Sequence, residues 1–374
     1  PAYASRSATT NPADDEPGFT YGPVLGGDSI WIGETRAVIR RLGAPPIGQI
    51  PGISLAWIAP AGSPPFTSNL LRNSVVEHDG KAVARQNGDA ADLLRTGQAA
   101  SVDSFRRDGL TFDVLDEGPV DGSPVVLLHG FPQRASSWQA TTEILNRAGF
   151  RTYAVDQRGY GPRSRRRGRR GHRVAELVED VAELIEQIGK PVTLVGHDWG
   201  AIVAWSITTR KPDLVAHLVA ASVPHLAAYF SSLVRSNQLL MSWYVGLFQL
   251  PLVPELLTRF GWMRGWLDRI GMSPAAITAW ERDFIGEGSL RGALGWYRAL
   301  PLLEPREVRV KTTRPTTFLW SDGDQMLGRK GAELTERYVT GPYRYVELNG
   351  YSHWLPDEAP EVFAELVIDG PPQR

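Results

Sequence analysis

The chain reads Val195-Gly196-His197-Asp198-Trp199-Gly200-Ala201 at the end of the apolar run 191–195. A nucleophile with a small residue two positions away on either side is typical of a sharp turn from a strand into a helix. Gly196 and Gly200 suit this turn because strand and helix must pass close together. The stretch therefore predicts a strand–turn–helix unit with Asp198 at the tip of the turn.

Asp198 determines which bonds such a turn could break. A serine would attack an acyl carbonyl, but after attack on a saturated carbon it would leave an ether that water does not readily cleave. An aspartate leaves an ester whose carbonyl carbon an activated water attacks, so a covalent cycle closes without a cofactor. A glycine-rich turn with an incidental surface aspartate is the alternative, and the rest of the chain must decide.

The composition of the 374 residues excludes several classes of protein. Lys and Arg number 40 and Asp and Glu number 41, so a net charge of -1 gives no general attraction to nucleic acid or an anionic membrane. The absence of cysteine excludes disulfides, thiolate catalysis and thiolate-bound metals. No apolar stretch approaches the roughly 18–20 residues of a membrane span, and no signal peptide is visible. We therefore expect a cytoplasmic protein without a membrane span.

The sequence falls into three regions. Residues 1–100 are rich in Pro and Gly without sustained periodicity, which predicts a largely irregular N-terminal extension. Residues 101–224 and 302–374 alternate strands with helices and predict one α/β core domain with a mostly parallel sheet. Residues 225–301 are helical and rich in aromatic residues. We expect them to form a cap over the carboxyl edge of the sheet, where open α/β sheets bind ligands.

Periodicity locates the elements of the core. The apolar side chains of residues 174–188 recur every three or four positions, which predicts a helix that ends at Gly189. A second helix is expected at 137–148. Strands are expected at 104–107, 110–115, 124–128, 151–155, 191–195, 218–223, 316–320 and 344–348.

Two late loops supply partners for Asp198. A nucleophilic carboxylate needs a base that activates water and an acid that orients the base. In this kind of sheet they follow the nucleophile in the order acid, then histidine, each after a late strand. Asp324 follows the strand at 316–320 and His353 follows the strand at 344–348, so we expect Asp324 as the acid and His353 as the base. Asp322 is the weaker candidate for the acid.

A third loop follows the early strand at 124–128 and reads His129-Gly130-Phe131-Pro132. The negative charge of a tetrahedral intermediate requires two preorganised N–H donors. We expect these donors to be the backbone amides of Phe131 and Trp199. Pro132 has no N–H, so its expected role is to fix the turn, with a cis bond as one way of doing so. An ordinary turn is the alternative for this motif.

Together, the His129–Pro132 motif, the Asp198 turn, the Asp324 loop and His353 resemble the epoxide hydrolases of the α/β-hydrolase fold. The resemblance covers the chain from about Val102 onward. It implies that two cap tyrosines bind and protonate the epoxide oxygen, and Tyr244 and Tyr297 match those positions.

Haloalkane dehalogenases share the Asp-Trp-Gly motif and remain the alternative. They commonly carry Asn or Glu where this chain has Phe131, because a departing halide needs donors. An esterase is disfavoured because the turn lacks serine, and a non-catalytic ligand receptor on the same fold is less consistent with an intact set of catalytic residues.

The resemblance also implies a small apolar epoxide as substrate and neither an organic cofactor nor a metal. Nucleic acid is not expected as a partner, because the arginine-rich loop 163–173 contains no aromatic residue and is better explained as a solvated loop. A homodimer is left open. Aromatic residues that could line the substrate channel are Trp243, Phe248, Trp296 and Trp354.

Overall fold

The computed structural model describes residues 101–304 and 308–373, together with the backbone of five short strands nearer the N-terminus. Contacts divide the chain into two units, Pro1–Asn87 and Gly88–Arg374. In the first unit, β1 (Ser29–Ile32), β2 (Thr35–Arg40) and β3 (Ser54–Ala56) form a sheet, and β4 (Glu77–His78) pairs with β5 (Lys81–Ala82). Apart from these strands, the expected irregular extension lies outside the described residues.

Within the described part of the second unit, eight strands form a sheet in the order β13-β12-β11-β10-β8-β9-β7-β6. The six strands from β13 to β9 are parallel, whereas β7 and β6 run antiparallel at one edge. This confirms the predicted mostly parallel sheet. The strands are β6 (Ser104–Arg107), β7 (Leu110–Glu117), β8 (Ser123–Leu128), β9 (Phe150–Val155), β10 (Val192–His197), β11 (Val215–Ala221), β12 (Thr316–Ser321) and β13 (Tyr343–Leu348).

Helices cover both faces of this sheet, as expected for parallel strands with apolar residues on both sides. On one face, the buried side chains of Val125, Leu127 and Val195 pack with those of α2 (Gln139–Arg147) and α15 (Pro360–Ile368). On the other face, the alternate residues Val126 and Leu194 pack with α3 (Val174–Ile188) and α4 (Trp199–Arg210). Two shorter helices, α13 (Arg329–Thr335) and α14 (Leu355–Glu358), follow β12 and β13.

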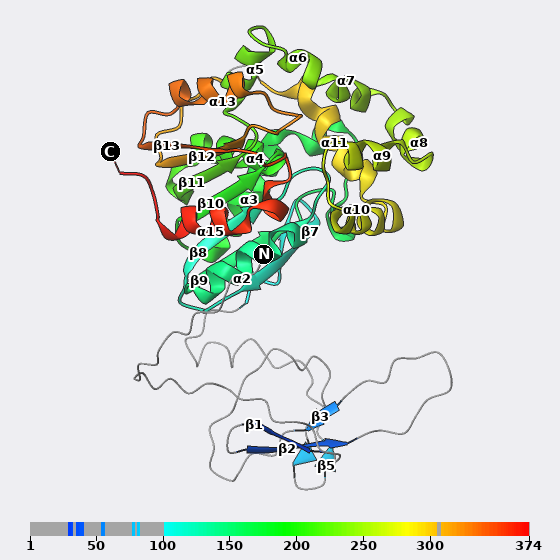
Figure 1. Cartoon of the computed structure of the whole chain (residues 1–374), viewed down its shortest axis with the longest axis vertical. Coiled ribbons are helices and arrows are strands. Elements are labelled where there is room, and N and C mark those ends of the chain that lie inside the picture. Colours follow the sequence, from blue (N-terminus) through cyan, green and yellow to red (C-terminus); the bar gives the residue numbers. More distant parts are fainter. Residues whose placement is uncertain are drawn as a thin grey trace, which may run out of the picture. The chain divides into compact units, whose positions relative to one another are not determined.

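A helical cap is inserted between β11 and β12, and Figure 1 shows most of its helices gathered at one side of the sheet. The cap consists of α5 (Leu226–Leu233), α6 (Gln238–Met241), α7 (Trp243–Gln249), α8 (Val253–Arg259), α9 (Trp262–Arg269), α10 (Pro274–Trp280), a π-helical turn at Glu281–Gly286 and α11 (Leu290–Ala299). The predicted insertion at 225–301 therefore corresponds to observed helices.

One strand was displaced in the sequence-based expectation. The strand predicted at 218–223 is β11 at Val215–Ala221, and it ends where Ser222 adopts a φ of 63°. Its first residues were missed because His217 interrupts the apolar pattern. In the structure His217 is buried, and its Nε2 lies 3.1 Å from the hydroxyl of Thr317 on the neighbouring β12. A polar side chain with a buried partner thus belongs to the strand.

The arginine-rich loop 163–173 makes ion pairs with the core domain. Arg163 pairs with Asp113 of β7, and Arg173 pairs with Glu176 of α3 at 2.8 Å. These contacts agree with the interpretation of the loop as part of the protein surface.

Arg158, which donates a hydrogen bond to the Gly171 carbonyl of this loop, is the centre of a buried ionic cluster. The Arg158 guanidinium is fully buried and donates two hydrogen bonds to the Asp180 carboxylate, at 2.6 and 2.7 Å. Asp180 also accepts a bond of 2.7 Å from Arg107 of β6. The Arg158 carbonyl accepts a bond from the indole of Trp296 in the cap at 2.8 Å. The cluster therefore connects α3, the edge of the sheet and the cap.

We expect Asp180→Ala to lower the free energy of unfolding by about 3 kcal/mol, because the buried Arg158 loses its two shortest hydrogen bonds and keeps only the partly exposed Asp108 as an ionic partner, at 3.2 Å. Urea denaturation followed by tryptophan fluorescence measures the loss. Glu179→Ala is the matched control, since it removes an exposed pair with Lys211 and should cost less than about 1 kcal/mol. Equal losses in both variants would contradict the assigned role of Asp180.

Candidate active site

The turn between β10 and α4 places Asp198 at a φ of 52° and a ψ of -119°, a strained conformation for a residue with a side chain. Two glycines make the turn sterically possible. A Cβ atom on Gly200 would lie 2.1 Å from the Leu128 carbonyl oxygen, and one on Gly196 would lie 2.4 Å from the Gly200 carbonyl oxygen. The predicted close passage of strand and helix is therefore confirmed.

The Asp198 carboxylate is buried, and backbone amides hold it. Its Oδ1 accepts a hydrogen bond of 2.8 Å from the Phe131 amide, and the Trp199 amide also stabilises its charge. Burial raises the pKa of Asp198 above its ordinary value, although these amides and His353 oppose the shift. The N-terminus of α4 adds a favourable partial charge for an anion. The structure thus brings both expected oxyanion donors to one carboxylate.

His353 lies between two carboxylates. Its Nδ1 is 2.8 Å from Asp324 Oδ2, and its Nε2 is 3.7 Å from Asp198 Oδ2. Burial by itself would lower the pKa of His353, but the charges of Asp324 and Asp198 outweigh burial and raise it. The geometry orients the Nε2 atom towards the nucleophile.

The loop after β12 holds Asp324 in place. Asp324 Oδ1 accepts hydrogen bonds from the amides of Met326 at 2.7 Å and Leu327 at 2.9 Å. Asp322 instead accepts a bond of 2.7 Å from the Gly350 amide and is exposed. Asp324 is therefore the carboxylate that contacts His353, and Asp322 supports a turn.

Two further histidines, His129 and His197, belong to the motifs of the sequence analysis, which assigned no role to them. In the structure they form hydrogen bonds that hold the loops of the site. His129 Nε2 accepts a bond of 3.2 Å from the Gln157 amide, and burial lowers the pKa of His129 to about 4, so the ring is neutral. His197 Nε2 lies 2.8 Å from the carbonyl oxygen of His353. The Phe131–Pro132 peptide bond is cis, as expected for this turn.

Tyr244 and Tyr297 face the same cavity as Asp198 from two cap helices, α7 and α11. Their ring centroids are 6.1 Å apart. Burial, with the negative charge of Asp198, raises the pKa of both hydroxyls well above the ordinary value of 10. Both hydroxyls therefore stay protonated and neutral across the physiological pH range.

The cavity between core and cap is small, with a volume of about 10 Å³, which is room for about one water molecule. Cap residues that sequence reasoning missed contribute to its wall, namely Trp266, Leu267 and Ile270 of the α9 region. Met326 of the β12–α13 loop was missed as well. The sequence contains one feature that could have indicated this wall. Trp262 and Trp266 are four residues apart, which places two tryptophans on one face of a helix.

The four aromatic residues expected to bind substrate have different positions. Trp354 lines the small cavity, and Trp243 lines a larger pocket beside it. Phe248 and Trp296 line neither. Phe248 is fully buried and packs edge-on against Phe131 at 5.6 Å. Trp296 is bonded to the core as described above, so the contacts that the structure shows for these two residues are packing contacts.

The described residues contain neither a cluster of metal ligands nor a membrane-spanning helix. No group of three or more His, Asp or Glu side chains there could hold a metal ion. Among the same residues, no helix is long and apolar enough to cross a membrane.

Comparison with known proteins identifies relatives of the second unit. Residues 125–366 match the alpha/beta hydrolase family. The chain is 33% identical over 264 residues to epoxide hydrolase 2 of Caenorhabditis elegans, covering 66% of this chain and 73% of that protein. It is 32% identical over 274 residues to the AB hydrolase superfamily protein YfhM of Bacillus subtilis, covering 70% and 94%.

Among solved structures, the crystal structure of epoxide hydrolase A from Mycobacterium thermoresistibile superposes with a TM-score of 0.62. The two sequences are 27% identical, and the match covers 72% of this chain and 98% of that one.

Proposed function

Because this chain belongs to the alpha/beta hydrolase family, and within it to the epoxide hydrolases, we propose that it converts an epoxide and water into a vicinal diol through a covalent ester on Asp198. The observation that supports the proposal is that one cavity is lined by residues of both the core and the cap. Asp198 and His353 approach it from the core, and Tyr244 and Tyr297 approach it from the cap. A carboxylate nucleophile opposite two neutral hydroxyl donors suits the opening of an epoxide.

In the first step, Asp198 Oδ2 attacks an epoxide carbon and forms the ester bond. The carbon–oxygen bond of the ring breaks, and its electron pair goes to the epoxide oxygen. Tyr244 and Tyr297 bind that oxygen, and one of them donates a proton to it. Asp198 Oδ1 remains with the Phe131 amide and becomes the ester carbonyl oxygen.

In the second step, His353 takes a proton from water while the water oxygen attacks the ester carbon. The negative charge develops on Oδ1, where the amides of Phe131 and Trp199 stabilise it. The bond between the ester carbon and the alkyl oxygen then breaks, and protonated His353 gives its proton to that oxygen, so the diol leaves. Asp198 keeps the water oxygen and loses the second water proton, which restores both the carboxylate and the tyrosine that donated in the first step.

The two steps are electrostatically linked. Asp198 in its charged form raises the pKa of His353. Esterification removes that charge, so the pKa of His353 falls and the neutral imidazole becomes more abundant when a base is required. Asp324 continues to orient the ring throughout.

A cytoplasmic location and a homodimer stay predictions from the sequence.

The first prediction concerns the covalent intermediate. Asp198→Ala should abolish turnover, whereas His353→Gln should form the ester once and then stall, because no base activates water. Mass spectrometry of His353→Gln after treatment with styrene oxide should find one adduct on the peptide that contains Asp198. Asp322→Asn is the control and should keep turnover. If His353→Gln shows no adduct, the covalent mechanism is wrong.

The second prediction concerns the cap tyrosines. Tyr244→Phe and Tyr297→Phe should each lower kcat for diol formation by about 100-fold, since each removes a donor but keeps its ring. Tyr229→Phe is the matched control, because Tyr229 donates to Ser242 outside the cavity. A dehalogenase would tolerate both substitutions. That alternative would be favoured if the double variant still releases halide from a panel of haloalkanes and the native chain forms no diol from epoxides.

The third prediction concerns pH. Because the basic form of His353 is lost as pH falls through its pKa, the rate of ester hydrolysis should decline on the acid side. The midpoint in single-turnover kinetics should lie below the His353 pKa measured by NMR in the free protein, because the ester lacks the Asp198 charge. No alkaline decline should occur below pH 10, since both tyrosine pKa values lie well above it. Equal midpoints would refute the electrostatic link.

A further inference from the structure

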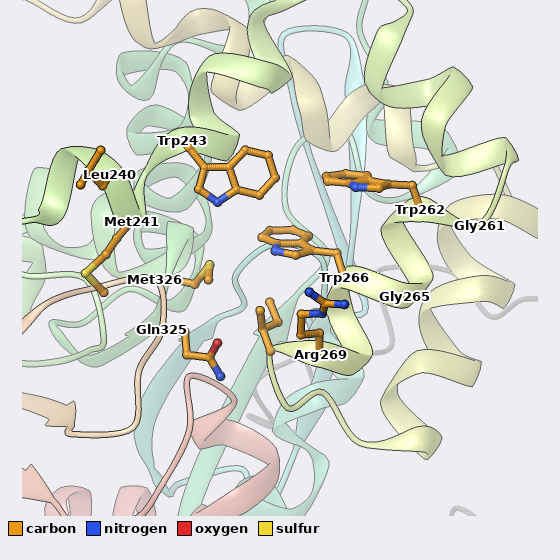
Figure 2. Close-up of a pocket in the computed structure, with 11 residues that line it drawn as sticks. Leu240, Met241, Trp243, Gly261, Trp262, Gly265, Trp266, Arg269, Gln325 and Met326 are labelled. Carbon is orange, nitrogen blue, oxygen red and sulfur yellow. The ribbon is translucent and has the colours of Figure 1, made fainter.

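A second, larger pocket adjoins the catalytic cavity. It has a volume of about 780 Å³, within the range of small-molecule sites. Figure 2 shows three tryptophans around it, from α7 and α9. Trp262 and Trp266 are stacked at 5.7 Å with an interplanar angle of 8°, and Trp243 lies edge-on to them at 6.0 and 6.2 Å. We call this the tryptophan pocket.

The tryptophan pocket and the catalytic cavity share a wall. Trp266, Ile270 and Met326 line both spaces. The catalytic cavity has room for about one water molecule, so the substituents of an epoxide that binds there must extend beyond it. The neighbouring space behind this wall is the tryptophan pocket.

Met326 is suited to be the adjustable part of the wall. Its amide donates to Asp324 at 2.7 Å, and its carbonyl accepts a bond of 2.8 Å from Gln238 of α6. The backbone is therefore fixed at both ends of the residue. The side chain is an unbranched thioether, which changes conformation more readily than a branched or aromatic one. A slim chain could pass where its methyl group now lies.

The lining of the pocket indicates what it binds. Edge and face contacts between aromatic rings are favourable beyond the area that the rings bury. Methionine sulfur also contacts rings favourably, and Met241 and Met326 both line the pocket. Trp243 is 49% exposed, so part of this apolar side chain remains open to contact with a ligand. An aromatic group fits this lining better than an alkyl chain of equal length.

We propose that the tryptophan pocket is the subsite for an aryl group at the far end of the substrate, joined to the epoxide by a slim unbranched spacer that passes Met326. This inference rests on the proposed function. It assigns Trp243, Trp262 and Trp266 as specificity-determining residues for aryl-terminated epoxides.

Gly265 offers a direct test because it lines the pocket on α9. A Cβ atom there would meet no atom within 4 Å, and the backbone has no left-handed φ, so Gly265→Phe adds a ring at the pocket lining without backbone strain. Gly246 on α7 has the same open surroundings and lies outside both spaces. Gly246→Phe is therefore a matched control.

The experiment compares phenyl glycidyl ether, a linear alkyl epoxide of equal length and 1,2-epoxybutane. Gly265→Phe should lower kcat/KM for the aryl epoxide by about tenfold or more and change that for 1,2-epoxybutane by less than about twofold. The alkyl epoxide should lose less than the aryl one, and Gly246→Phe should alter none of the three.

Equal losses for aryl epoxide and 1,2-epoxybutane would overturn the subsite, because the pocket would then be only a passage. Equal losses for aryl and alkyl epoxides would overturn the aromatic assignment, and no loss would overturn both. Binding of the phenyl diol, followed as quenching of tryptophan fluorescence, gives a readout without turnover. If the native chain forms no diol but binds the phenyl diol, and Gly265→Phe weakens this binding, the proposed function would be refuted and the subsite supported.

Discussion

The strained turn at Asp198 is the constraint on which the site depends. Gly200 lies so close to the Leu128 carbonyl that strand β8, strand β10 and helix α4 meet at one point. The same approach leaves no room for a side chain on Gly130, whose Cβ would lie 2.4 Å from the Asp198 Cβ. The Phe131 amide therefore reaches the carboxylate as a consequence of packing. The positions of the Asp198 carboxylate and of the amide that binds it therefore depend on the same close packing. The strained conformation of Asp198 persists because the surrounding structure enforces it.

Burial then determines the chemistry of the site. The residues that line the catalytic cavity include no lysine or arginine, so the charges of Asp198 and Asp324 act on the His353 imidazole without a competing cation in the lining. Backbone amides provide the hydrogen bonds that each carboxylate needs. Because amides do not titrate, the groups whose pKa responds to a change of charge on Asp198 include His353 and the two cap tyrosines. The neutral hydroxyls of the cap tyrosines follow from the same burial, since the cost of a buried phenolate keeps the proton on oxygen.

Sequence reasoning predicted those parts of the site that local patterns determine. The turn at Asp198, the loops that carry Asp324 and His353, and the His129–Pro132 motif each occupy a few consecutive residues, and the structure places Asp198, Asp324 and His353 together. The shape of the cavity was not predicted, because Trp266, Ile270 and Met326 meet only when the cap folds onto the core. Phe248 and Trp296 were expected at the substrate for the same reason, since the cap sequence does not distinguish a ring that packs from a ring that lines a pocket.

The contacts between cap and core differ from one side of the cap to the other. Near α11, which carries Tyr297, polar bonds join the two parts: the Trp296 indole to the Arg158 carbonyl at 2.8 Å, the Ser289 hydroxyl to the Tyr160 carbonyl at 2.7 Å, and Arg134 to Glu287 at 2.7 Å. At the wall towards the tryptophan pocket, the lining side chains are mostly apolar, and the polar bonds include those of the Trp354 indole to the Ile270 carbonyl at 3.2 Å and of the Gln238 amide to the Met326 carbonyl at 2.8 Å. Directional bonds fix position, whereas apolar contacts tolerate rearrangement. In the proposed function, the bonds near α11 therefore fix Tyr297 relative to Asp198, whereas the apolar side chains of the opposite wall leave room for adjustment.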